Sequence, residues 1–478
     1  MPRFALRWWG LGVVICATLV DLMNNQIVTV ALPVIHNQLG GGEAALQWIS
    51  AGYALALALT LITGGRLGDR YGVKRLFLTG LVLFTIVSLA AGLAPNVGVL
   101  IAARVLQGIS SGLMVPQVLS YIYTEFPEEE RTKATAFYTA SFTLGNIAGP
   151  LLGSALTQGN LFGTSWRAIF LINVPLGVLV VAGIVWTIPA RKGALSHRID
   201  SRGLVLLVAA LFALFYPLVQ GRELGWPVWV IVLFVAAIPL FWLFARQQRA
   251  QSRRGGEPLI PPTLLRYRTL RSGLAILFTL SIGMGVFFVL NLHLQLGLGY
   301  PPLLVALVFL LPGALGTVAS NFAAVRLAKR FGQKPVVTTG VVLALAGLAA
   351  LAVLVAGLGS ALAAWVPPVP TFVFGLGIGA VMNLVFTLSL AEVVPEEAGA
   401  ASGLVGTNLQ LGTASGIAVS GTVFFSLQGS GSATATAVTI AVSVGVLLIT
   451  LLAAVSIPKG AAAGESLVDS ERHGASAR

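Results

Sequence analysis

Long apolar segments follow one another along almost the whole chain, and they restrict its fold more than any other feature. Fourteen such segments, each of about 18–28 residues with few charges, can be counted in the 478 residues. Their approximate ranges are 10–34, 46–66, 76–94, 98–122, 134–157, 167–188, 202–219, 226–246, 272–296, 302–325, 335–357, 369–391, 400–427 and 434–456. Because backbone in lipid must satisfy its own hydrogen bonds, each segment is predicted to be a helix. The sequence predicts an all-α polytopic membrane protein with fourteen transmembrane helices.

The composition supports this class and excludes several others. Hydrophobic residues make up 56% of the chain and charged residues 9%, with a mean hydropathy of +0.91. The first apolar segment ends at Pro33 without a small-residue cleavage site, so we expect a retained helix rather than a signal peptide. The single cysteine, Cys16, excludes an intrachain disulfide.

The basic residues indicate the orientation in the membrane. If the N-terminus is cytoplasmic, 26 of the 29 Lys and Arg residues fall on the inner side. Arg167 and Arg222 then lie outside, and Arg104 lies within the membrane. The positive-inside rule therefore predicts that both termini lie in the cytoplasm. We expect a multi-pass protein of the plasma (inner) membrane, and a composition rich in Ala, Gly, Val and Arg is associated with bacteria. The net charge of +13 indicates topology and contact with anionic lipid, and no nucleic-acid partner is predicted because no binding module accompanies it.

A loop in the first half of the chain recurs in the second half. Residues 66–75 and 326–335, which are 260 positions apart, share the pattern Arg-Leu-x-x-Arg-aromatic-Gly-x-Lys. Thr79-Gly80 and Thr339-Gly340 repeat with the same offset. Two halves in the same orientation are typical of transporters in which two bundles enclose a substrate site near the bilayer midplane.

The offset of 260 residues exceeds what six helices require and leaves room for two more between the halves. The predicted domains are an N-terminal six-helix bundle, two additional transmembrane helices, a cytoplasmic linker, a C-terminal six-helix bundle and a disordered cytoplasmic tail. Their predicted ranges are 1–190, 191–250, 251–271, 272–457 and 458–478 respectively.

Four motifs resemble those of a known transporter family. Residues 65–75 resemble the loop between helices 2 and 3 of the major facilitator superfamily, and residues 104–108 resemble its helix 4 motif. Residues 145–154 resemble the antiporter motif of helix 5, with Ser154 in place of the usual glycine. Trp166-Arg167 together with residues 170–175 is similar to the start of helix 6 in the fourteen-helix drug–proton antiporters of the EmrB/QacA type.

This resemblance implies both an architecture and an activity. The fold would be the major facilitator fold, two six-helix bundles plus two extra central helices. The activity would be proton-coupled export of hydrophobic or amphiphilic compounds such as drugs, by alternating access, which is multidrug efflux and a cause of antibiotic resistance. The expected partners are a small-molecule substrate, protons and the lipid bilayer. No cofactor, metal, catalytic residue or obligate protein partner is predicted.

Asp21 and Arg104 are the only acidic and the only basic residue deep inside an apolar segment. Ionisable groups in the membrane usually mark an ion or substrate pathway because holding them there is costly. We therefore assign proton coupling to these two residues. The alternatives are a permanently protonated Asp21, hydrogen-bonded to Asn24 or Asn25, and a structural Arg104 capped by carbonyl groups. The family's usual helix 1 aspartate falls at Asn24, so Asp21 would act one turn away.

Two further motifs have mechanical roles. The loop at Gly65, Asp69, Arg70, Gly72 and Arg75 is predicted to gate the inner side, through charge pairs between the bundles that break on opening. The antiporter motif places small residues every four positions along one helix, a surface for close packing and flexing. Its residues are Gly145, Gly149, Pro150 and Gly153.

Polar and aromatic residues in the spans are candidates for lining the substrate cavity. Aromatic rings and amides suit a bulky ligand, with cation–π attraction if it is positively charged. The candidates are Asn24, Asn25, Trp48, Tyr53, Gln107, Ser111, Tyr138, Phe142, Phe287 and Asn291. His293 and Gln295 are expected at the membrane interface instead.

The alternative function is dedicated export of one metabolite made by the host, neutral or anionic, since the helices contain one acid and also one arginine. An enzyme is not predicted, because the four histidines are scattered rather than clustered near one membrane face. An ATP-driven pump is disfavoured because the chain has no phosphate-binding Gly-x-x-x-x-Gly-Lys-Ser/Thr loop.

Overall fold

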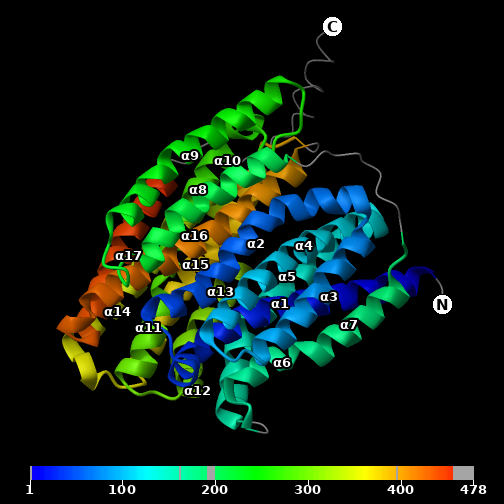
Figure 1. Cartoon of the computed structure of the whole chain (residues 1–478). Coiled ribbons are helices and arrows are strands. Elements are labelled where there is room, and N and C mark those ends of the chain that lie inside the picture. The colour runs from blue at the N-terminus through cyan, green and yellow to red at the C-terminus, as the bar shows by residue number, and fades with distance from the viewer. Residues whose placement is uncertain (1–2, 161–162, 191–199, 395–396, 456–478) are drawn as a thin grey trace.

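The computed structural model describes residues 3–160, 163–190, 200–394 and 397–455, and the regular elements in these ranges are all helical. The all-α class predicted from the sequence is confirmed. The ribbon in Figure 1 is a bundle of long helices packed side by side. The predicted tail at 458–478 and the first residues, 191–199, of the range predicted for the two additional helices lie outside the described residues.

The long helices follow the predicted apolar segments closely. In chain order they are α1 (Arg3–Leu39), α2 (Glu43–Tyr71), α3 (Val73–Gly92), α4 (Val97–Glu125), α5 (Glu128–Gly159), α6 (Ala168–Leu171), α7 (Asn173–Thr187), α8 (Ser201–Gln220), α9 (Val228–Arg253), α10 (Arg268–Met284), α11 (Val286–Leu292), α12 (Pro302–Val305), α13 (Leu311–Phe331), α14 (Gln333–Leu358), α15 (Pro368–Leu390), α16 (Ala398–Leu427) and α17 (Ser432–Val455). The π-helical turns η4 (His293–Gly297) and η5 (Ala306–Leu310) extend α11 and join α12 to α13.

Twelve helical stretches within the described ranges are long and apolar enough to cross a membrane. The helices α5 and α16, with 32 and 30 residues, are not among these twelve. Both still pack along a spanning helix, α5 against α1 and α16 against α2. The exact number of fourteen spans stays a prediction.

Several helix ends follow directly from the local sequence. The side chain of Asn96 caps α4 by accepting a hydrogen bond from the Val99 N–H at 3.0 Å. The side chain of Asp200 caps α8 in the same way, with the Gly203 N–H at 2.9 Å. Such caps satisfy N–H groups that the first helical turn leaves unpaired. The start of α5 after Pro127 carries three glutamates in its first turn, where the helix dipole favours negative charge.

The two copies of the repeated loop have the same backbone geometry. Gly72 follows α2 with φ 93°, and Gly332 follows α13 with φ 89°. Their N–H groups donate to the carbonyls of Gly68 and Ala328 at 2.8 and 2.9 Å. Positive φ values are accessible to glycine at little cost, which explains the residue at both positions. We call the side of the bundle that carries these two loops the basic side, and the other the opposite side.

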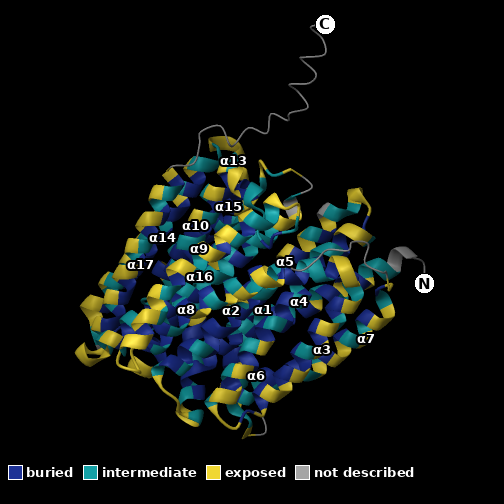
Figure 2. Ribbon diagram, turned by 45° about the horizontal axis from the view of Figure 1, so that its top comes forward, coloured by how far each residue is buried: buried dark blue, intermediate teal, exposed yellow. Residues whose placement is uncertain are grey.

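The core joins helices from both halves of the chain. One buried cluster combines Ile27 and Ile49 of the first half with Phe288 and Phe424 of the second. A separate large cluster lies within the second half alone and includes Leu277. Figure 2 shows buried residues in the interior of the bundle and exposed residues over its outer helices.

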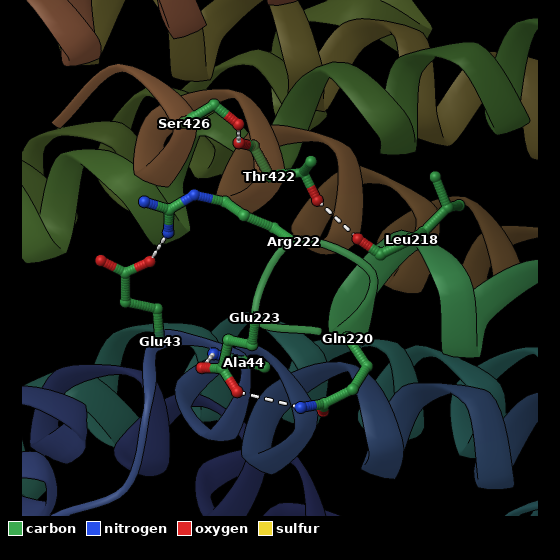
Figure 3. Close-up of polar contacts among 8 residues, drawn as sticks. All are labelled: Glu43, Ala44, Leu218, Gln220, Arg222, Glu223, Thr422 and Ser426. Atoms are coloured by element: carbon green, nitrogen blue, oxygen red, sulfur yellow. Dashed lines mark hydrogen bonds and ion pairs between the residues drawn. The ribbon is translucent and has the colours of Figure 1, made fainter. Parts of the chain in front are cut away.

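The helices α8 and α9 form a hairpin that is fastened to α2 and α16. Figure 3 shows the loop between them: Arg222 pairs with Glu43, and Glu223 accepts a hydrogen bond from the Ala44 N–H at 2.8 Å. On its other side, the Thr422 hydroxyl of α16 donates to a carbonyl of α8 at 2.7 Å. The additional helices therefore contact both halves at the opposite side.

Candidate functional site

The Asp21 carboxyl group lies at the centre of a buried hydrogen-bond network. Asp21 is in the middle of α1 and is 4% exposed. Its Oδ1 accepts hydrogen bonds from the Tyr53 hydroxyl of α2, at 2.7 Å, and from the Ser111 hydroxyl of α4. The two hydroxyl oxygens also lie 3.2 Å apart. Two hydroxyl donors from two other helices thus meet one membrane-embedded carboxyl oxygen.

Tyr53 connects Asp21 to Arg104. The Arg104 guanidinium carbon lies 4.3 Å from the centre of the Tyr53 ring, a cation–π geometry. Arg104 is fully buried and forms no ion pair with Asp21 within the described part of the chain. The tyrosine therefore separates the two charges, its ring facing the cation and its hydroxyl facing the acid.

Neutral acceptors bind the Arg104 guanidinium group. Its Nε donates to the Ile49 carbonyl at 3.0 Å, and its Nη1 donates to Gln107 Oε1 at 2.9 Å. Gln107 in turn donates to the Ser88 hydroxyl at 2.9 Å. The Arg104 Nη2 has no hydrogen-bond partner among the described residues. The carbonyl-capped arrangement, left as an alternative at the sequence level, describes part of this environment.

Close packing of α4 on α2 positions this network. A Cβ at Gly108 would collide with the backbone carbonyl of Tyr53, and one at Gly112 would collide with Thr60. Small residues at such positions let two helix backbones approach each other. The glycines on α4 therefore bring Ser111 close enough to reach the same carboxyl group as Tyr53.

The two asparagines on α1 do not bond to Asp21. Asn24 Oδ1 accepts a hydrogen bond from Asn173 of α7 at 3.0 Å, and Asn24 Nδ2 has no partner in the described ranges. Asn25 is half-buried one position further along. The sequence placed Asn173 in the helix 6 motif, but Asn173 was not among the candidate site residues. An asparagine within an otherwise apolar segment was the signal available.

The antiporter motif of α5 is a packing surface against α1. A Cβ at Gly145 would meet Leu22, and Cβ atoms at Gly149 and Gly153 would meet Gln26 and Ile27. Pro150 lies within the same stretch of α5. The close approach of α5 to α1 around Asp21 depends on this stripe. At its end, the Ser154 hydroxyl donates to the Pro302 carbonyl of the second half at 3.1 Å.

The structure separates the aromatic candidates into three groups. Tyr138 and Phe142 of α5 pack edge to face, 5.1 Å apart. Trp48 instead lies against α8, with its ring 6.5 Å from Tyr216. Phe287 packs against Phe309 and Phe374 within the second half. Tyr138 and Phe142 lie on α5, the helix that packs most extensively against α1.

Amides from the second half bind the backbone of α1 directly. Asn291 Nδ2 donates to the Thr29 carbonyl at 2.7 Å, and Gln295 Nε2 donates to the Val30 carbonyl at 3.0 Å. Gln295 also donates to Asn291 at 2.9 Å. His293 and Gln295 were predicted at the membrane interface, yet they are only 1% and 8% exposed. The spacing of 291 and 295 on one helical face was the missed signal.

The gating loop lies at the surface of the basic side. Asp69, Arg70 and Arg75 are exposed, and the Arg70 guanidinium carbon lies 5.3 Å from the centre of the Tyr71 ring. The predicted linker, residues 251–271, also contacts this loop. Arg66 donates to the carbonyls of residues 257 and 258. Gly65 packs near α4, where a Cβ would lie 3.9 Å from Pro116.

The described residues contain no group of three His, Cys, Asp or Glu side chains arranged to hold a metal ion. The site is therefore a set of hydroxyls, amides and two separated charges inside a helical bundle. Such groups can donate and accept hydrogen bonds.

Comparison with known proteins identifies the family to which this architecture belongs. The family model described as Major Facilitator Superfamily matches residues 14–417. The chain is 40% identical over 436 residues to the probable actinorhodin transporter of Streptomyces coelicolor, covering 90% of this chain and 74% of that protein. It is 33% identical to the tetracenomycin C resistance and export protein of Streptomyces glaucescens, with 90% and 78% coverage.

A solved structure has the same fold at low sequence identity. A bacterial homologue of the human lysosomal transporter Spinster, crystallised inward-facing and unoccupied, matches with a TM-score of 0.68 at 17% identity. The match covers 96% of this chain and 99% of that one. The match confirms the major facilitator fold expected from the sequence, while the two extra helices and the fourteen spans stay predictions.

Proposed function

The chain belongs to the Major Facilitator Superfamily, and from that premise we propose that it is a proton-coupled antiporter in which Asp21 carries the proton. It is a transporter and not an enzyme, and it exports antibiotics or related metabolites. The relatives that support export include proteins named for tetracenomycin C export and cephamycin export. Proton coupling is the part that we propose here, and its main support is the buried network around Asp21.

The environment of Asp21 suits alternate proton loading and release. A carboxyl group in a dry site favours its neutral form, and hydroxyl donors or a nearby cation favour its charged form. Here Tyr53 and Ser111 supply the donors, and Arg104 supplies the cation behind the Tyr53 ring. A movement of α2 and α4 relative to α1 would change the hydrogen bonds to Asp21 and its distance from Arg104 together. Each proton that moves down the membrane potential releases about 2.3 kcal/mol per 100 mV, enough to drive uphill export.

The distribution of contacts between the halves supports alternating access. Hydrogen bonds from Asn291 and Gln295 join the halves toward the opposite side. Toward the basic side, Cβ atoms at Gly399 and Gly403 of α16 would have nothing within 4 Å. We infer a conformation closed at the opposite side. The exposed Asp69 and Arg75 would form their pairs between the bundles when the basic side closes.

The remaining assignments belong to the same proposal. The basic side faces the cytoplasm of the plasma membrane, as the positive-inside rule indicates. The bundles occupy the ranges 1–190 and 272–457, with the α8–α9 hairpin and a linker between them. Tyr138 and Phe142 line the substrate path on the basic side of Asp21. Trp48 is a weaker candidate because it lies against α8.

The second candidate is export of a single host-made metabolite. Two of the relatives reported above are named for one antibiotic each. Arg104 Nη2 and Asn24 Nδ2 are buried donors without partners among the described residues, and such donors suit a neutral or anionic ligand rich in carbonyl oxygens. A narrow substrate range would distinguish this candidate from multidrug export.

The deciding experiment uses the full-length protein in liposomes with an imposed pH gradient. Internal pH is followed together with transport of ethidium and tetracenomycin C. We expect substrate-dependent proton flux in the wild type and only background flux in Asp21→Asn. The matched control is Ser281→Ala, which changes the corresponding position 260 residues later.

Each outcome has a clear interpretation. Coupled flux that survives Asp21→Asn would refute the assignment of the proton to Asp21. Transport that ignores the gradient in the wild type would make the protein a facilitator. Transport of tetracenomycin C without ethidium would favour the single-metabolite exporter.

A further inference from the structure

The helix α9 has one long face that no other described element covers. Its apolar members recur every three or four positions, so they lie on one side of the helix. All are exposed: Val228, Ile231, Val235, Ile238 and Trp242. Only 17% of the most apolar window of this helix is buried, the lowest share among the twelve candidate spans. This face is therefore exposed to acyl chains when the protein is in a bilayer.

The same face becomes basic at the end of α9 on the basic side. Residues of its last turns line a hollow of about 450 Å³, a volume in the range of small-ligand sites. The lining residues are Trp242, Ala245, Arg246, Arg249, Ala250, Arg253 and Arg254. The Arg246 guanidinium carbon lies 5.4 Å from the centre of the Trp242 ring. An aromatic ring thus marks the boundary between the apolar and the basic part of the face.

No carboxylate among the described residues pairs with these arginines. Arg246, Arg249 and Arg253 form no ion pair in the described part of the chain. The acid at the start of the neighbouring helix, Asp200, is engaged by amides, since Gln247 and Gln248 each donate to it at 2.8 Å. The hollow therefore keeps its positive charge available for an external anion.

We propose that this hollow on α9, lined by residues between Trp242 and Arg254, is a binding site for an anionic phospholipid of the leaflet on the basic side. The headgroup phosphate binds between Arg246, Arg249 and Arg253, and an acyl chain follows the apolar residues toward Val228. Guanidinium groups bind phosphate oxygens through paired N–H donors. Tryptophan is enriched at the level of the headgroups, the position required of Trp242.

The dimensions fit a lipid better than a soluble anion. The stretch from Val228 to Trp242 rises about 21 Å along the helix, which is more than half of a hydrocarbon core of about 30 Å. A phosphate bound at Arg249 is thus continuous with a track long enough for an acyl chain. A free anion would use the arginines and leave the apolar track without a function.

The test measures the fluorescence of Trp242 in vesicles. The full-length protein is reconstituted in phosphatidylcholine with a small fraction of phosphatidylglycerol whose acyl chains carry bromine, a short-range quencher. The difference in fluorescence quenching between the wild type and Trp242→Phe gives the part of the signal that comes from Trp242. We expect brominated phosphatidylglycerol to bind at least about fivefold more strongly than brominated phosphatidylcholine, since one arginine near an anionic surface corresponds to a change of that size.

Two triple variants with equal loss of charge distinguish a site from a general attraction. Arg246→Gln, Arg249→Gln and Arg253→Gln together should bring the preference below about twofold. Arg266→Gln, Arg268→Gln and Arg271→Gln remove the same charge on the same side and should leave it unchanged. Equal quenching by the two lipids, or equal losses in both triples, would overturn the proposal. Displacement by inorganic phosphate would also overturn it, by indicating a soluble anion.

Discussion

The two halves of the molecule share their helix packing but not their chemistry. In the first half, a Cβ at Gly108 of α4 would meet the Tyr53 carbonyl of α2. In the second half, a Cβ at Gly375 of α15 would meet the Gly313 carbonyl of α13 in the same way. Tyr53 and Gly313 are 260 positions apart. The crossing is therefore repeated, while the residue that donates to Asp21 is replaced by a glycine.

The surroundings of Arg104 differ in the same manner. Gly108 and Gly375 are 267 positions apart. The same offset pairs Arg104 with Thr371, and Gln107 with Phe374. Phe374 packs 4.8 Å from Phe287, whose ring centre lies 5.2 Å from that of Phe309. The second half thus has a threonine in place of the guanidinium, and a ring of an aromatic cluster in place of the amide. One helix arrangement holds either a polar network or an apolar core.

The largest expected effect comes from copying the polar residue into the apolar half. Phe374→Gln removes a buried ring and buries an amide with no partner, so we expect a loss of about 4 kcal/mol in the free energy of unfolding. Phe374→Met, which keeps the volume apolar, should cost about 1.5 kcal/mol. Thermal unfolding in detergent measures both. Equal losses would show that this position of the second half accepts an amide as well as an apolar side chain, against the contrast between the halves.

The second expected effect concerns the polar network itself. Arg104→Met leaves the Ile49 carbonyl and Gln107 without their donor, which predicts a loss of about 3 kcal/mol. Thr371→Val removes a hydroxyl that donates only within its own helix, to Pro367 and Pro368, and should cost about 1 kcal/mol. The same unfolding assay compares them. A smaller loss for Arg104→Met than for Thr371→Val would contradict the contrast between the halves.

The third prediction concerns the loops that the two halves share. Gly72→Ala and Gly332→Ala should each cost about 1–2 kcal/mol, because both glycines have positive φ. The charges differ, with Asp69 in one loop and Lys329 in the other. We therefore expect Asp69→Asn to slow export in liposomes more than Lys329→Gln does. Equal effects on export would mean that the two loops gate symmetrically.

The smallest expected effect lies at the attachment of the α8–α9 hairpin. The side chains of Arg222 and Glu43 are 38% and 31% exposed, so Arg222→Gln should cost less than about 1 kcal/mol. Unfolding midpoints at low and high salt measure this cost. A large, salt-dependent loss in Arg222→Gln would make the hairpin a main support of the fold.

The contact between α5 and the start of α12 should matter slightly more. Ser154→Ala removes the hydroxyl that donates to the Pro302 carbonyl and should cost about 1 kcal/mol. The same unfolding assay gives the order of the two variants.

The partners of the site residues were less predictable than the residues themselves. Asp21, Tyr53, Ser111, Arg104 and Gln107 all followed from polarity within apolar segments. The hydrogen bonds that unite them did not, because Tyr53 and Ser111 lie 32 and 90 positions from Asp21. Helical periodicity indicates which residues share a face of their own helix. It does not indicate which neighbouring helix that face meets.

The sequence by itself determined the features that depend on local physics. The apolar segments, the glycine shared by the two repeated loops, and the repeat with an offset of 260 residues can be recognised from the sequence alone. Each follows from hydrogen bonding or steric freedom within a few residues of chain. The family motifs are also local, and they led to the correct fold.

Only the tertiary structure decided how distant helices share these residues. It placed Tyr53 between Asp21 and Arg104, turned Trp48 toward α8, and buried Gln295 against the backbone of α1. These outcomes depend on side-chain packing summed over many helix contacts, in which each pair contributes little. The position of a polar residue along its helix is set locally, but its partner is set by the packing of the whole bundle.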